Sequence, residues 1–149
     1  MTTVKILHTK GNGTFEESDF DVPDIKSDQI RVKSIYTGVC RSDIDMMNGD
    51  FGPLPLNMQG HDGLGDVVEI GADVKDIEVG DYVATRGEPG FADYYNCNVK
   101  DYVIIPKAEP KYIIKPVSCS INIASRIIGS PVNSSIAIIG TGFLARMIY

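Results

Sequence analysis

Several residue types that would point to particular classes of protein are scarce or missing in this chain. Its 149 residues include no tryptophan, two histidines and only three cysteines, and no acidic residue follows Glu109. Three irregularly spaced cysteines do not make a disulfide framework and are expected to be reduced thiols. No apolar run approaches the roughly 20 residues of a membrane span, so no membrane association is expected. The first ten residues, MTTVKILHTK, contain no signal-peptide core, which predicts a cytoplasmic location.

Positive charge is also in short supply. The chain has 14 Lys and Arg against 20 Asp and Glu, a net charge of -6. Nucleic-acid binding needs clustered Lys and Arg, so no nucleic-acid partner is expected. The last 40 residues contain four basic residues and no acid. A segment so poor in charge predicts burial against a second copy in a homo-oligomer or against another packing partner.

Short strand-like runs separated by Gly and Pro turn signals fill residues 1–116. The predicted strands are Val4–Leu7, Gln29–Lys33, Val67–Ile70, Tyr82–Ala84, Tyr102–Ile105 and Tyr112–Lys115. Strands at this spacing predict a mainly β domain with short helices, folded as a small barrel or sandwich. One short helix is expected after Cys40, with Ser42 as its N-cap and Asn48-Gly49 at its exit.

The sequence changes character near Pro116, where we place a domain boundary. Residues 120–128 are compatible with a helix that Gly129-Ser130-Pro131 ends, and Ser135–Ile139 is typical of a strand buried on both faces. A GxGxxA turn follows at residues 140–145, as at the start of dinucleotide-binding units. Residues 117–149 therefore predict a linker helix and the first strand and turn of an incomplete nucleotide-binding domain. The acid that would bind a ribose about 20 residues later has no counterpart.

Two candidate metal ligands, Cys40 and His61, lie 21 residues apart in turn-like segments. Cys and neutral His are preferred ligands of zinc, and a helix N-terminus next to Cys40 favours its thiolate. An acid follows each site, at Asp43 and Asp62. Asp43 is the candidate for orienting His61, because a metal-bound His usually gives its second N–H to a carboxylate. The alternative is a buried Cys and a hydrogen-bonded His in turns, with no metal.

The motifs and their order resemble those of the zinc-containing medium-chain alcohol and polyol dehydrogenases. The matching segments are Gly38-Val39-Cys40-Arg41-Ser42-Asp43, Gly60-His61-Asp62, and Val79-Gly80-Asp81-Tyr82-Val83. The resemblance runs over nearly the whole chain. It implies a GroES-like β-barrel over residues 1–116, followed by the truncated first strand of a Rossmann α/β domain.

The resemblance also implies roles for individual residues of the first motif and the second. Cys40 and His61 are implied as ligands of a catalytic Zn²⁺, and Asp62 stands where relatives have a Glu close to the metal. Ser42 is implied as the hydroxyl that relays the alcohol proton, although it can equally cap the helix. Arg41 is implied to meet the cofactor pyrophosphate; an exposed surface charge is the alternative.

The cofactor and the third zinc ligand involve the segment after the barrel. Gly140, Gly142 and Ala145 are implied to hold the pyrophosphate of NAD or NADP in a full-length protein. Relatives place a third zinc ligand, a Cys, Glu or Asp, in this segment. Here the segment offers only Cys119. If Cys119 is a buried thiol instead, there is no third ligand in the segment. Relatives with a structural zinc carry four close cysteines, whereas Arg86–Lys100 contains only Cys97.

The implied function is hydride transfer between a small-molecule alcohol, polyol or sugar and NAD(P). This chain would be a catalytic-domain fragment with little or no activity alone. The rival is a non-enzymatic GroES-like remnant that acts as a binding or interaction module. The presence of Cys40, Ser42, Asp43 and His61 together favours the enzyme, and the uncertain third ligand favours the module.

Overall fold

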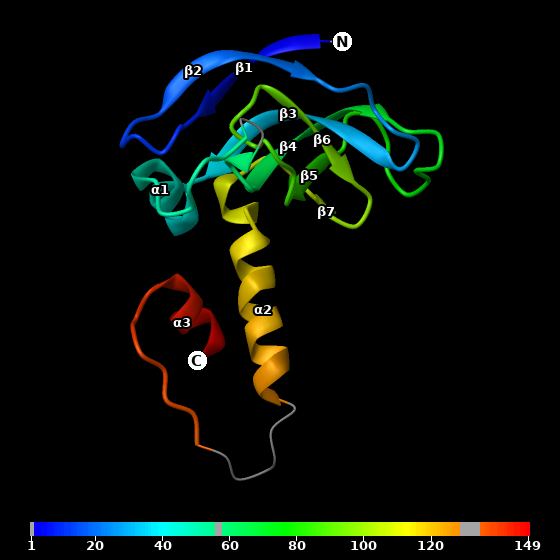
Figure 1. Ribbon diagram of the computed structural model, residues 1–149. Coiled ribbons are helices and arrows are strands. Elements are labelled where there is room, and N and C mark those ends of the chain that lie inside the picture. The colour runs from blue at the N-terminus through cyan, green and yellow to red at the C-terminus, as the bar shows by residue number, and fades with distance from the viewer. Residues whose placement is uncertain (1, 56–57, 129–134) are drawn as a thin grey trace. The chain divides into compact units, whose positions relative to one another are not determined.

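The computed structural model describes residues 2–55, 58–128 and 135–149, which fall into two compact units (Figure 1). The first unit is Met1–Ile113 and the second is Ile114–Tyr149. Within the described residues, no helix combines the length and the apolar character needed to cross a bilayer.

A five-stranded antiparallel sheet forms the centre of the first unit. Its strand order is β6-β3-β4-β5-β7. The strands are β3 (Gln29–Gly38), β4 (Asp62–Ile70), β5 (Tyr82–Thr85), β6 (Tyr94–Asn98) and β7 (Tyr102–Ile105). Most of these strands were predicted, although β6 was not. The mainly β class with short helices is confirmed.

A second sheet pairs β1 (Thr2–His8) with β2 (Glu16–Val22). A strand was predicted within β1, at Val4–Leu7, whereas β2 was not predicted. Backbone bonds join it to the segment before β6: Leu7 N–H donates to Phe91 O at 3.0 Å, and Asp93 N–H donates to Lys5 O at 3.1 Å. An isolated bridge pairs Ile6 with Ala92. Among the described residues the two sheets are therefore linked but do not close into a continuous hydrogen-bonded barrel.

The core of the first unit follows from the alternation of side chains along its strands. Ile30 and Val32 on β3 are completely buried, whereas Arg31 and Lys33 between them are not. They pack with Val67 and Val83 from the neighbouring strands and with Tyr95. The Tyr95 hydroxyl is 2.8 Å from Thr85 Oγ1, which satisfies both buried groups. This sheet is the rigid platform on which the loops at its edge are held.

Helix α1 (Arg41–Asn48) follows β3 after a two-residue turn. Its N-cap is Cys40, so the prediction that Ser42 caps the helix was wrong by two residues. The reason is that Asp43 acts as the capping carboxylate: its Oδ2 accepts the Cys40 N–H at 2.7 Å. At the other end Gly49 is the C-cap with φ of 88°, as the Asn48-Gly49 pair predicted.

The first helix of the second unit begins earlier in the chain than the sequence indicated. Helix α2 is Lys115–Ile128, so Pro116 lies in its first turn, where proline needs no backbone donor. The predicted strand at Tyr112–Lys115 is wrong: Tyr112 ends a 3-10 helix (Pro110–Tyr112), the next two residues are neither helix nor strand, and Lys115 begins α2. The predicted helix break at Gly129-Ser130-Pro131 lies outside the described residues.

Residues 135–141 connect to helix α3 (Phe143–Ile148) and form neither helix nor strand. The strand predicted at Ser135–Ile139 is thus not present as a hydrogen-bonded element. A strand needs a neighbour, and no described residue pairs with this segment. That residues 117–149 begin a nucleotide-binding domain stays a prediction.

Candidate functional site

The pairing of β3 with β4 brings the two ligand-bearing segments together. Gly38, the last residue of β3, is the register partner of Asp62, the first residue of β4. Cys40 lies two residues beyond this pair on one side, and His61 lies one residue before it on the other. The register of these two strands therefore brings Cys40 and His61 close together in space, although they lie 21 residues apart in the chain. A Cβ on Gly38 would lie 3.0 Å from the Asp62 Cβ, so the strands meet closely here.

Three side chains of different donor type converge at this end of the sheet. Donor atoms of Cys40, His61 and Asp62 all lie within 4.8 Å of one another. Asp62 and His61 are buried, and Cys40 is partly exposed. Tetrahedral zinc with bonds of about 2.0–2.3 Å places its ligand atoms roughly 3–4 Å apart. The group is therefore compact enough for one metal ion to contact all three side chains after small side-chain movements.

Asp43 lies next to His61 and is completely buried. Its Oδ2 accepts the Cys40 N–H at 2.7 Å, and its Oδ1 accepts the Gly60 N–H at 3.2 Å. His61 Nδ1 is 3.8 Å from Asp43 Oδ1, which is longer than a hydrogen bond. These two hydrogen bonds of the carboxylate go to the backbone, so the role of Asp43 in orienting the His61 ring stays a prediction.

Ser42 and Arg41 on α1 differ in their position relative to the cluster. The Ser42 hydroxyl is 3.4 Å from His61 Nε2, next to the candidate ligands. The Arg41 side chain is 81% exposed and pairs with Asp45, with Nε 2.7 Å from Oδ1. Arg41 is therefore a surface cation in this structure, with its guanidinium partly available to an anion.

The other two cysteines are Cys97 in the first unit and Cys119 in the second. Burial raises the pKa of the Cys97 thiol to about 12, and the Asp101 charge adds to the shift. Such a thiol stays protonated at neutral pH and is a poor metal ligand. Cys119 lies on α2 in the second unit as a partly exposed free thiol. Within the first unit, Asp62 is the carboxylate that lies beside Cys40 and His61.

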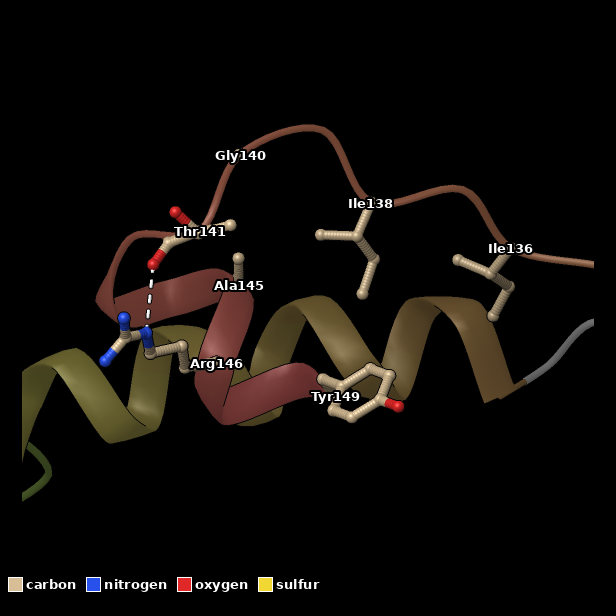
Figure 2. Close-up of a pocket in the computed structure, with 7 residues that line it drawn as sticks. All are labelled: Ile136, Ile138, Gly140, Thr141, Ala145, Arg146 and Tyr149. Carbon is tan, nitrogen blue, oxygen red and sulfur yellow. Dashed lines mark hydrogen bonds between the residues drawn. The ribbon is translucent and has the colours of Figure 1, made fainter.

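The predicted pyrophosphate turn lies entirely in the second unit. Gly140 has φ of 105°, a conformation that favours glycine, and Gly142 is the N-cap of α3. Figure 2 shows the segment from Ile136 to Thr141 running past α2 and α3, with the side chains of Ile136 and Ile138 pointing toward the side on which these helices lie. These segments line a hollow of about 540 Å³ together with Ala145, Arg146 and Tyr149. Arg146 Nε donates to Thr141 O at 3.1 Å, and this bond ties the turn to the helix (Figure 2).

The support behind the His61 turn was not anticipated from the sequence. Gly60 has φ of 74°, and a Cβ there would lie 2.5 Å from the Phe91 backbone nitrogen. Gly90 N–H donates to Gly60 O at 2.6 Å, and Thr37 Oγ1 donates to Gly90 O at 2.6 Å. These residues are far apart in the chain, so only the presence of a glycine before His61 signalled the close packing.

Comparison with known proteins finds matches to dehydrogenases. The model of the alcohol dehydrogenase GroES-like domain matches residues 26–109, which include every residue of the cluster. D-arabitol-phosphate dehydrogenase of Enterococcus avium is 36% identical over 85 residues, covering 56% of this chain and 23% of that protein. An alcohol dehydrogenase of Schizosaccharomyces pombe is 29% identical over 150 aligned residues, covering 77% of this chain and 42% of that protein.

Solved structures show the same architecture. A protein described as a zinc-binding dehydrogenase of Sinorhizobium meliloti, bound to NADP, superposes with a TM-score of 0.77 at 21% identity. The superposition covers 99% of this chain and 52% of that one. This likeness confirms the fold class that the sequence predicted. The chain spans about half of that structure, and less than half of the two relatives above.

Proposed function

Since the chain belongs to the family of the alcohol dehydrogenase GroES-like domain, we propose that it forms the metal-binding part of a zinc-dependent dehydrogenase. The reaction is hydride transfer between a small-molecule alcohol, polyol or sugar and NAD(P). The observation that carries the proposal is the convergence of Cys40, His61 and Asp62 within a single compact unit. Three protein ligands are the number that catalytic zinc sites normally keep.

The donor set fits zinc by its chemistry. One sulfur, one imidazole nitrogen and one carboxylate oxygen are all zinc ligands, and the partly exposed Cys40 leaves a side of the cluster open to a further ligand. The neighbouring Asp43 adds a buried carboxylate without a Lys or Arg partner among the described residues. Buried negative charge of this kind is stabilised by a bound cation. Zinc held there would polarise the substrate oxygen and lower the pKa of the alcohol.

The chain's own residues then supply proton movement and orientation. The Ser42 hydroxyl lies beside His61 and would accept the alcohol proton and pass it toward solvent. Asp43 holds the backbone on both sides of the cluster. Arg41 would use the guanidinium nitrogens not bonded to Asp45 to contact the cofactor pyrophosphate.

The cofactor would meet the second unit at Gly140, Gly142 and Ala145, whose turn lets a backbone approach pyrophosphate. No acid follows Glu109, so the segment that carries the glycine turn offers no carboxylate to a ribose. We therefore expect hydride transfer by this chain alone to be slow or undetectable. The apolar second unit would be covered in a homo-oligomer or by another packing partner. Three free cysteines suit a reducing, cytoplasmic setting.

The zinc content of the purified chain tests the proposal. We expect about one zinc per chain, lost in Cys40→Ala and kept in Cys119→Ala, which removes a second partly exposed thiol as a control. Zinc lost from both variants would make Cys119 a ligand as well. A wild-type chain that takes up no zinc would instead favour the non-enzymatic binding module.

A further inference from the structure

A single carboxylate connects the two turns that carry the candidate metal donors. Asp43 Oδ2 accepts the N–H of Cys40 at 2.7 Å, and Asp43 Oδ1 accepts the N–H of Gly60 at 3.2 Å. Gly60 directly precedes His61, so the same side chain holds the backbone next to both donors. The two amides lie 20 residues apart in the chain, and no strand pairing joins them directly.

The distances separate this arrangement from an ordinary histidine–carboxylate pair. The ring atom His61 Nδ1 is 3.8 Å from Asp43 Oδ1, whereas both backbone amides are within hydrogen-bond range. Asp43 has no exposed surface, so solvent water has little access to its carboxylate oxygens. Hydrogen bonds between a carboxylate and backbone N–H groups are stronger than neutral ones, and stronger still when buried. The carboxylate therefore acts mainly on the positions of the two turns.

We infer that Asp43 is a positioning residue that fixes the separation of Cys40 and His61, so that the donor cluster is assembled before any metal ion binds. This inference rests on the proposed role of the cluster as a metal site. A pre-assembled site loses less conformational entropy when the ion binds, which raises affinity. It also distinguishes this unit from small zinc domains, in which the metal folds the chain.

An amide cannot replace this carboxylate, although it has nearly the same size. Asn at position 43 keeps one acceptor oxygen but turns an NH₂ donor toward the other backbone N–H. One of the two bonds is therefore lost in Asp43→Asn. Asp45→Asn is the matched control, because it makes the same change on the same helix at a carboxylate bonded to the exposed Arg41.

Cobalt(II) is the probe, because its visible spectrum reports the ligands and their geometry. We expect Asp43→Asn to bind Co²⁺ about 10- to 100-fold more weakly than the wild type, the usual effect of losing such a supporting residue. We also expect an altered ligand-field spectrum at saturating Co²⁺, which a merely structural loss of folded protein would not produce. Asp45→Asn keeps wild-type affinity and spectrum. Wild-type behaviour of Asp43→Asn would overturn the inference.

Amide hydrogen exchange tests the inference without a metal. In the metal-free wild-type chain, the amides of Cys40 and Gly60 are expected to be protected, and at least one loses protection in Asp43→Asn. Rapid exchange of both amides in the metal-free wild type would overturn pre-assembly, even if the variant does not fold. A wild type that binds no Co²⁺ but protects both amides would refute the proposed function and leave the positioning role standing.

Discussion

The two units of the chain differ in how far their apolar side chains are buried. In Met1–Ile113, isoleucine and valine from adjacent strands are fully buried, and Ile30 has no exposed surface. In Ile114–Tyr149, Ile139 is 100% exposed and Phe143 is 55% exposed. Both units are rich in β-branched residues, so composition does not explain the difference. What differs, in the part of the chain that the structure describes, is the number of neighbouring elements: five paired strands in one sheet, against two helices and an extended segment.

The two units also carry different parts of the proposed chemistry. The metal-donor cluster lies wholly in the first unit, where sheet register fixes it. The glycine turn lies wholly in the second, where the preceding residues form no strand. We therefore expect changes in the first unit to affect stability and metal binding, and equivalent changes in the second to affect neither.

The largest contrast is expected from one substitution made in both units. Ile30→Ala should lower the free energy of unfolding by about 2–5 kcal/mol, because it leaves a cavity in the sheet core. Ile139→Ala removes the same atoms from an exposed side chain and should change it by less than about 0.5 kcal/mol. Urea-induced unfolding measures both. Equal losses would mean that the second unit has a core of its own.

A pair of glycines, one in each unit, distinguishes the two candidate sites. Gly60→Ala places a Cβ 2.5 Å from the Phe91 nitrogen at a φ of 74°, and such strain costs on the order of 1–3 kcal/mol. It should also displace His61 and weaken zinc binding. Gly142→Ala has open space around the new Cβ and an ordinary φ of -70°. It should leave the unfolding free energy and zinc content unchanged; a loss of zinc from this variant would contradict the separation of the sites.

The buried Cys97 thiol is expected to make the free energy of unfolding depend on pH, with a smaller effect than the substitutions above. Burial raises the pKa of Cys97 from 9.0 to about 12, so the unfolded chain releases this proton first as pH rises. The stabilisation is complete below pH 9 and is lost between pH 9 and about 12, with a slope of at most about 1.4 kcal/mol per pH unit. Cys97→Ala should reduce this slope, whereas Cys119→Ala should not. Burial also raises the pKa of Tyr95, so some slope remains.

Urea unfolding at several pH values checks this expectation. A wild-type chain whose stability is constant from about pH 9 upward would show that Cys97 is accessible to solvent. The same result would also remove the reason for excluding Cys97 as a metal ligand.

Local sequence patterns predicted most of the first unit because its strands are alternating runs bounded by Gly and Pro. They did not predict β2 (Glu16–Val22), whose acidic sequence EESDFDV is held by pairing with β1. They were wrong at Tyr112–Lys115, where β-branched residues favour a strand but Lys115 is the first residue of α2. The motifs singled out Cys40 and His61, whose donor atoms lie close together in the structure; that they bind a metal stays a prediction. The Asp43 bond to Gly60 was not, because contacts between residues distant in sequence carry no local signal.

X-ray absorption at the zinc edge of the purified chain is the sharpest test of the proposed metal site, because it counts the sulfur atoms bound to the metal. We expect one sulfur at about 2.3 Å, from Cys40, and the remaining ligands to be nitrogen or oxygen at about 2.0–2.2 Å. A first shell without sulfur, or one with two sulfur atoms, would contradict a site made by Cys40, His61 and Asp62.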